Sequence, residues 1–197
     1  MKKIVAIILV LCALLALASC GKKTDNNADL DTVKAAVAAT SLKNAHVEVV
    51  ATNSFIAEPL TAKYDIVYDT DGSAEIEFTY ELYNEISENG TQDVKTEYSG
   101  SATVASNGEV VGDPVSGTVT AAGSANFNLD PSKMTYSFEM GIFTANIPAA
   151  NTAAVLGISV GADVVLTVSV ANGVVTGATV TYTKDNVKNE IVCTYNN

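Results

Sequence analysis

The feature that most constrains the fold is a two-residue alternation of apolar and polar side chains, which recurs along most of the chain after Asn44. It is clearest in residues 63–69 (KYDIVYD), 75–82 (EIEFTYEL) and 134–140 (MTYSFEM). Successive side chains of a β-strand point to opposite faces, so the alternation places one set in a core and the other in water. Strands with one solvent-exposed face are typical of antiparallel sheets. The sequence therefore predicts an antiparallel sheet covered on one side.

Short turns separate the alternating runs. Residues 69–72 (DTDG) predict a hairpin between two of them. The Asn-Gly pairs at 107–108 and 172–173 predict two more, because both central residues of a type I′ turn need a positive φ. A further turn is expected at 184–186 (KDN). The last three strands then form a meander over 164–171, 174–183 and 187–195.

A helix is expected before the first strand. In residues 29–40 (DLDTVKAAVAAT), Leu30, Val33 and Val37 recur at helical spacing, and alanines occupy several of the positions between them. Such a stripe is typical of a helix that packs on a core. The run predicts an amphipathic helix packed on the sheet.

Two later segments depart from the strand pattern. Residues 151–156 (NTAAVL) predict a second short helix, capped by Asn151 and ended by Gly157. Residues 99–125 have small side chains on both faces, which specifies strand register weakly, and the sequence leaves open whether they form a sheet edge or a flap. The expected fold is mainly β (α+β): an antiparallel, curved sheet or half-barrel meander with the N-terminal helix packed on it and the second short helix near 151–156.

The charge balance excludes one class of partner. The chain has 22 acidic residues and 11 basic ones, all of them lysines, with a formal net charge of −11. Without arginine it has no fork-shaped donor for bidentate phosphate recognition, and its field repels polyanions. We therefore expect no nucleic-acid binding.

The first twenty residues have the composition of an export signal. Lys2 and Lys3 precede an apolar run over 4–16, which is too short for a bilayer core that needs about 20 apolar residues. The run ends at 17–20 (LASC), where two small residues directly precede Cys20. This arrangement resembles the lipobox of bacterial lipoproteins. The resemblance implies a diacylglyceryl thioether on Cys20, cleavage before it, and an outward-facing anchor in the bacterial cell membrane, at the surface or in the periplasm.

The expected organisation of the chain follows from that resemblance. Residues 1–19 are a cleaved signal peptide, residues 20–28 hold the lipidated cysteine and a flexible tether, and residues 29–197 form a single domain. Cleavage removes two of the 11 lysines, which makes the formal net charge −13. It also removes Cys12, so Cys193 has no partner for an internal disulfide and is expected as a small buried hydrophobe on the last strand.

The sequence offers few candidates for catalysis or metal binding. His46 is the single histidine, so it cannot build a His-rich zinc site, and any Ser-His-Asp triad would have to use it. The turn at 69–72 does not fit a calcium loop: with Gly72 sixth, Val67 would be first and Phe78 twelfth, where oxygen ligands are required.

Three glutamates on one strand are the remaining candidates for acid–base chemistry. Glu75, Glu77 and Glu81 are separated by even numbers of residues, so they lie on the same face of the strand. The distance between two such glutamates that are two residues apart approaches the carboxylate separation of inverting glycosidases. They alternate with Ile76 and Phe78, so they are expected in water, without the burial that raises the pKa of a catalytic acid. We expect no enzymatic activity, no metal and no cofactor.

Two functions are compatible with these observations. The first is an interaction or structural module, whose helix fills the sheet and whose surface docks a protein partner. The alternative is a carrier of an apolar ligand, a lipid or acyl chain, between helix and curved sheet. A helix and meander on a lipid anchor is similar in architecture to lipoprotein-carrier and lipid-binding lipoproteins, although no family motif is matched. An apolar space under the helix favours the carrier, and close packing favours the module. The candidate ligand-binding residues are Leu30, Val33, Ala36, Val37, Tyr64, Tyr68, Phe78 and Tyr80.

The lipobox makes a direct prediction. Replacing the acceptor thiol in Cys20→Ala should block lipid transfer, leaving unprocessed precursor or released protein. Metabolic labelling with a clickable fatty acid should mark the wild type and not the variant. Equal labelling of the two would contradict lipidation at Cys20.

Overall fold

The computed structural model describes residues 27–53, 58–83, 95–106, 109–112 and 115–197. The expected signal peptide, Cys20 and most of the expected tether lie outside the described residues. No helix in the described part of the chain is long and apolar enough to cross a membrane.

The described strands form one open antiparallel sheet, which confirms the mainly β prediction. Its order is β5-β4-β3-β2-β1-β10-β9-β8-β7-β6. One meander runs outward from β1 to β5, and a second runs back from β6 to β10, so the first and last strands pair at the centre. The strands are β1 Asn44–Thr52, β2 Leu60–Tyr68, β3 Ala74–Tyr83, β4 Lys95–Val104, β5 Val110–Gly112, β6 Thr135–Glu139, β7 Ile142–Ile147, β8 Val164–Ala171, β9 Val174–Lys184 and β10 Val187–Asn196.

The tight turns of the second meander use left-handed backbone. The predicted type I′ turn between β8 and β9 is confirmed, with φ of 54° at Asn172 and 77° at Gly173. The turn between β9 and β10 has positive φ at both Asp185 and Asn186. In the first meander, the predicted hairpin at 69–72 joins β2 to β3. The Asn-Gly pair at 107–108 lies outside the described residues, although β4 and β5 on either side of it pair as expected.

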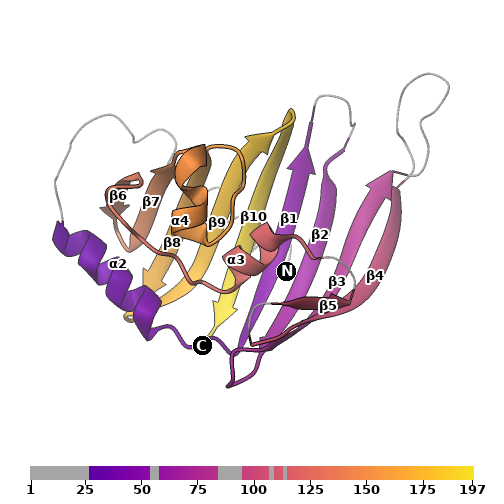
Figure 1. Cartoon of the computed structure of the whole chain (residues 1–197), viewed down its shortest axis with the longest axis horizontal. Coiled ribbons are helices and arrows are strands. Elements are labelled where there is room, and N and C mark those ends of the chain that lie inside the picture. The colour runs from indigo at the N-terminus through magenta and orange to yellow at the C-terminus, as the bar shows by residue number, and fades with distance from the viewer. Residues whose placement is uncertain (1–26, 54–57, 84–94, 107–108, 113–114) are drawn as a thin grey trace.

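The α-helices of the described residues lie on one face of the sheet, here called the inner face: α2 (Asn27–Ala39), α3 (Gly117–Gly123) and α4 (Thr152–Leu156) (Figure 1). Helix α2 contacts β9, and Leu30, Val33 and Ala36 on it are buried. Just after α2, the Thr40 hydroxyl accepts a hydrogen bond from the Val175 amide at 2.9 Å and ties the helix end to β9.

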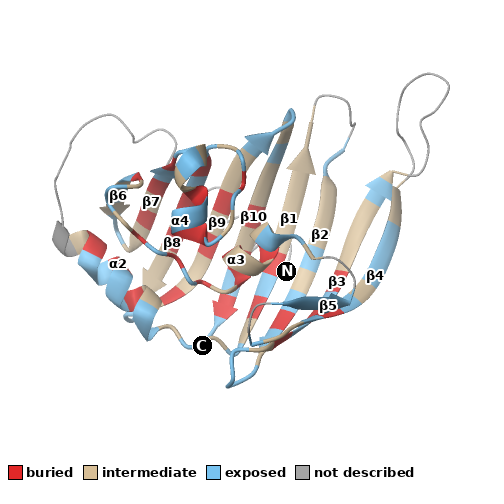
Figure 2. Cartoon of the chain, viewed as in Figure 1, coloured by how far each residue is buried: buried red, intermediate tan, exposed pale blue. Residues whose placement is uncertain are grey.

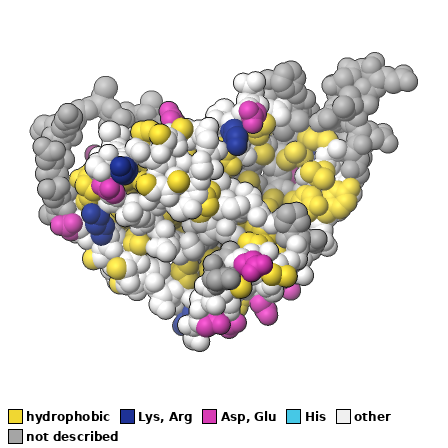
Figure 3. Space-filling model, in the orientation of Figure 1, with side chains coloured by type: hydrophobic (Ala, Val, Ile, Leu, Met, Phe, Trp, Pro, Cys, Tyr) yellow, Lys and Arg dark blue, Asp and Glu magenta, His cyan; other side chains and the backbone are white. Residues whose placement is uncertain are grey.

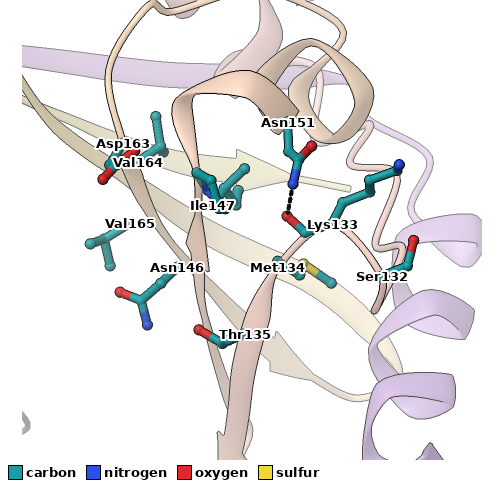
Figure 4. A pocket seen from close by; sticks show the side chains of 11 residues that line it. Ser132, Lys133, Met134, Thr135, Asn146, Ile147, Asn151, Asp163, Val164 and Val165 are labelled. Atoms are coloured by element: carbon teal, nitrogen blue, oxygen red, sulfur yellow. Dashed lines mark hydrogen bonds between the residues drawn. The ribbon is translucent and has the colours of Figure 1, made fainter.

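Helix α4 confirms the second predicted helix but corrects its cap. Gly157 ends the helix with a φ of 76°, as expected. Asn151 makes no side-chain cap hydrogen bond, and a 3-10 turn over Ala149–Asn151 leads into the helix instead. The Asn151 amide donates to the Lys133 carbonyl at 2.9 Å, so this side chain joins α4 to the chain before β6 (Figure 4).

Helix α3 corrects the expectation of a sheet edge or a flap over residues 99–125. Within this segment the last strand is β5, and residues 117–123 are helical. Ser116 begins the helix, because its hydroxyl accepts a hydrogen bond from the Thr118 amide at 3.3 Å. Val119 and Ala122, three residues apart, are buried on one side of it. The local composition of Gly, Thr and Ala does not specify a helix by itself. Contacts between α3 and the sheet therefore stabilise the helix.

The chain from Val115 to Met134 crosses the inner face from one edge of the sheet to the other, and we call it the strap (Figure 1). It carries α3 over the centre of the sheet. Beyond α3, Phe127 and Leu129 are buried. Asn128 between them donates from its backbone amide to the Val155 carbonyl at 2.9 Å, which holds the strap against α4.

The β8–β9 turn makes a testable prediction. A Cβ at Gly173 would meet no atom within 4 Å, so the cost of Gly173→Val lies in the backbone alone. Forcing a β-branched residue to a φ of 77° should lower the free energy of unfolding by about 1–2 kcal/mol, read from the urea midpoint. Gly173→Asn is the matched control, because asparagine tolerates this conformation. Equal midpoints for the Val and Asn variants would place the strain elsewhere.

Candidate functional site

The inner face is covered unevenly. Where the helices and strap lie on it, side chains are fully buried, including Val33, Val47, Phe143 and Leu166. On β2, β3 and β4 the inner-facing positions become half-buried or exposed toward one end of the strands (Figure 2). The sheet thus has a closed part and an open part.

The closed part is tightly packed at α3. A Cβ on Gly123 would lie 2.7 Å from the Ile66 Cδ1 and 3.5 Å from the Val47 Cγ2, so helix and sheet are in direct contact. The Tyr195 hydroxyl on β10 donates to the Ala122 carbonyl at the end of α3. This packing leaves no room for a ligand between α3 and the strands that these residues occupy.

The buried thiol beneath α3 is not a reactive group. Burial raises the pKa of Cys193 to about 12, so the thiol is uncharged at neutral pH. Burial also raises the pKa of Tyr195 well above its ordinary value, and the neighbouring Cys193 adds to the effect. Cys193 is buried as the sequence predicts.

The open part carries a patch of apolar side chains that we call the aromatic face. Leu82 is 45% exposed and Tyr98 is 39% exposed, although both occupy inner-face positions. No described helix lies over this part of the sheet (Figure 1). Figure 3 shows hydrophobic side chains gathered on the right of the view, over β3 and β4. The aromatic face consists of Leu60, Ala62, Tyr64, Phe78, Tyr80, Leu82 and Tyr98.

Four of these side chains form a continuous row across three strands. Tyr64 on β2 lies 5.8 Å from Phe78 on β3, measured between ring centroids. Phe78 lies 6.1 Å from Tyr80, and Tyr80 stacks on Tyr98 of β4 at 5.4 Å. Aromatic pairs at these separations stabilise one another beyond the area that they bury. The row is therefore a stiff apolar platform rather than a set of separate side chains.

The environment of the row disfavours negative charge. Burial raises the pKa of the Tyr64 phenol, and neighbouring Tyr80 raises it further. A phenolate at Tyr64 would be poorly solvated beside other apolar rings.

A group of charges joins the strands at the open end of the sheet, on the outer side. The Lys95 ammonium donates to the Pro59 carbonyl at 2.6 Å and lies 3.4 Å from Glu81 Oε2 and 3.5 Å from Glu58 Oε2. Glu81 also accepts hydrogen bonds from the Thr61 hydroxyl at 2.8 Å and the Thr61 amide at 2.9 Å. These hydrogen bonds from Thr61, and then the charge of Lys95, lower the pKa of Glu81.

Glu81 therefore differs from the solvated carboxylate that the sequence predicts. It lies on the outer face, as the alternation requires. Its ionised carboxylate accepts a hydrogen bond from Thr61 and forms an ion pair with Lys95. Glu75 and Glu77 are exposed, as expected. A carboxylate held ionised by its partners is unsuited to donate a proton at neutral pH.

The single histidine lies on the outer face of a central strand. His46 Nδ1 is 2.7 Å from Asp65 Oδ1 on the neighbouring strand, and both side chains are largely exposed. Within the described residues, no group of three His, Cys, Asp or Glu side chains is placed to hold a metal ion. The absence of catalysis at His46 stays a prediction.

A depression of about 400 Å³ lies at the far edge of the sheet, between β6, β7 and the chain around α4 (Figure 4). Two of the polar side chains that line it hold the surrounding loops together. The Asn151 amide donates to the Lys133 carbonyl, and Asp163 accepts from the Ala149 amide at 2.8 Å. These two side chains therefore have a structural role.

The structure divides the eight predicted ligand-binding residues into two groups. Leu30, Val33 and Ala36 are buried on α2, which contacts β9, and Val37 on the same helix is half-buried. The aromatic residues lie on β2 and β3, separated from β9 by β1 and β10. Tyr68 lies close to α3, at the border of the closed part. The structure therefore does not bring all eight residues together in one place between α2 and the sheet.

Sequence reasoning missed four members of the aromatic face: Leu60, Ala62, Leu82 and Tyr98. Leu82 is assigned to the correct face by alternation, but nothing in the sequence indicates that no described helix covers it. Tyr98 lies in 95–104 (KTEYSGSATV), where small side chains obscure the alternation. The pairing of Tyr98 with Tyr80 across β3 and β4 would have been the signal, had the register been known.

Comparisons with known proteins give no family. No family model matches the chain, and no curated protein matches it. Among solved structures, LprF from Mycobacterium bovis is 17% identical over 86% of this chain and 92% of its own, with a TM-score of 0.44. A lipoprotein-sorting protein domain from Vibrio parahaemolyticus is 6% identical over 85% and 90%, with a TM-score of 0.31. A DUF1329 family protein from Desulfovibrio piger is 10% identical over 86% and 90%, with a TM-score of 0.29. Likeness at this level assigns no function.

The close contact at α3 makes a prediction. Gly123→Ala adds a methyl group into a buried contact with Ile66, and the overpacking should cost about 1–3 kcal/mol of unfolding free energy in urea denaturation. Gly117→Ala on the same helix is the control, since its Cβ would lie 3.6 Å from Ile158 in ordinary contact. Ile66→Val removes the clashing Cδ1, so the penalty of Gly123→Ala should shrink in that background. An unchanged penalty there would refute the contact.

Proposed function

We propose that this chain is an exported, lipid-anchored bacterial protein that is not an enzyme and binds an apolar ligand, a lipid or acyl chain, on its aromatic face. The observation that carries the proposal is the exposure of Leu82 and Tyr98 on the inner side of the sheet. The ligand would lie beside the helices rather than beneath them. The anchor rests on the lipobox resemblance at Cys20.

Exposed inner-face side chains are a source of binding energy. Covering apolar surface with an acyl chain yields about 0.8 kcal/mol for each methylene group buried. Micromolar affinity corresponds to about 8 kcal/mol, so about ten methylene groups would supply it before the costs of association. The stiff row of rings lowers those costs, because its side chains are already ordered in contact with one another.

The anchor and the binding face fit together. A diacylglyceryl group carries two chains, which hold a protein stably where one chain would not. The acidic domain is repelled by anionic headgroups, so it stands away from the surface that its anchor enters. A ligand taken from or delivered to that membrane has only the reach of the tether to travel.

A docked protein is the second candidate, and the closed part of the inner face favours it. Helix α3 packs closely on the sheet at Gly123, so a ligand has no space beneath it. A protein segment with apolar side chains would also cover the aromatic face. The two candidates differ in whether the isolated domain takes up a small apolar molecule.

A pair of exposed aliphatic residues on opposite faces tests the proposal. Leu82→Glu places a charge on the aromatic face and should weaken saturable binding of Nile red, an uncharged apolar dye, at least tenfold, because the carboxylate must be desolvated or the dye displaced. Val67→Glu is the matched control: Val67 is 55% exposed and faces outward on β2, so dye affinity should not change.

Two results would contradict the proposal. One is the absence of saturable dye binding by the wild-type domain at micromolar concentrations. The other is an equal loss of affinity in the Leu82 and Val67 variants.

A second experiment looks for the natural ligand. Native mass spectrometry of the domain purified from cells should show a retained apolar molecule.

A further inference from the structure

We infer that the aromatic face accepts amphiphiles with an uncharged, hydroxyl-bearing head, such as acylglycerols, and discriminates against anionic ones such as fatty acids. The inference rests on the proposed function and specifies the chemistry of its ligand. It follows from where the charges of the surrounding strands lie.

The inner face of the first meander has no charged position in β1 to β4. The strand register assigns every second residue to this face, from Ala45 on β1 to Val104 on β4. All of these positions are occupied by alanine, valine, leucine, isoleucine, phenylalanine, tyrosine, glycine or threonine. An ionised head drawn onto this surface would lose hydration without gaining a counter-charge.

The lysines of the neighbouring strands do not compensate. Lys63 on β2, Lys95 on β4 and Lys188 on β10 all have the parity of the outer face. The Lys95 ammonium is held by the Pro59 carbonyl and two glutamates. The Lys188 ammonium lies 3.9 Å from Glu190. Since the chain has no arginine, no stronger anion ligand replaces them.

The surrounding field adds to the discrimination. The outer faces of β1 to β4 carry six acids, and the whole chain has twice as many acidic as basic residues. The six are Glu48, Asp65, Glu75, Glu77, Glu81 and Glu97. Only the thickness of one sheet separates these carboxylates from the aromatic face. They therefore repel an anion that approaches the aromatic face, and salt screens this repulsion only in part.

The aromatic face offers hydrogen bonds that suit a hydroxylated head. Tyr64 and Tyr80 each carry a phenol, which both donates and accepts, and both rings are only partly buried. Glycerol hydroxyls exchange such bonds without any net charge. A carboxylate can accept hydrogen bonds from these phenols, but they are uncharged and do not offset its negative charge in a partly buried surrounding.

The test compares two displacing molecules with the same chain length. Bound Nile red is displaced from the full domain by 1-monolauroylglycerol or by laurate, at pH 8, low salt and concentrations below micelle formation. At this pH the carboxylate is ionised. We expect 1-monolauroylglycerol to compete at least tenfold more strongly than laurate, and the gap to narrow at high salt.

A single added cation should offset the preference. Leu82→Lys puts an ammonium on the aromatic face at an exposed site, and it should improve competition by laurate at least tenfold. Val67→Lys adds the same charge to the outer face and should change it little. This pair distinguishes a local charge from the change in net charge.

The outcomes separate the inference from the proposed function. Competition by laurate that equals or exceeds that of 1-monolauroylglycerol in the wild type overturns the inference and leaves apolar binding intact. If Nile red does not bind saturably, both fail. If sedimentation velocity finds a dimer that Leu82→Glu dissociates, a second copy of the chain occupies the aromatic face, and both fail in favour of self-association.

Discussion

The architecture depends on the strap, which must carry the chain from β5 at one edge of the sheet to β6 at the other. It crosses the inner face because that is where its apolar residues can be buried, and it is fixed at α3 by the contact of Gly123 with Ile66 and the hydrogen bond from Tyr195. A single crossing with a short helix covers only part of a wide sheet. The closed and open parts of the inner face both follow from that limit.

The periodicity of the sequence was enough to predict the antiparallel sheet, because alternation and positive-φ turns are local signals. Asn172 and Gly173 specify their hairpin without reference to the rest of the chain. Helix α3 could not be predicted in the same way. Its seven residues are too few for helical periodicity to be read, and it is held by Ser116 at its start and by sheet residues far away in sequence.

The candidate site shows the same division between local and distant information. Alternation assigns Tyr64, Phe78 and Tyr80 to the inner face correctly, but parity does not state which part of that face the helices cover. Helix α2 contacts β9 rather than the strands that carry these rings. That choice depends on the order of strands in the sheet, which no segment of the sequence encodes by itself.

The pairing of β1 with β10 has a consequence for the order of folding. Asn44 and Asn196 face each other across these strands, 152 residues apart in the chain. The centre of the sheet therefore cannot close until the final strand has emerged, and contacts of such long range form slowly. During synthesis from the amino end, β1 therefore lacks one of its two neighbouring strands until β10 has been made.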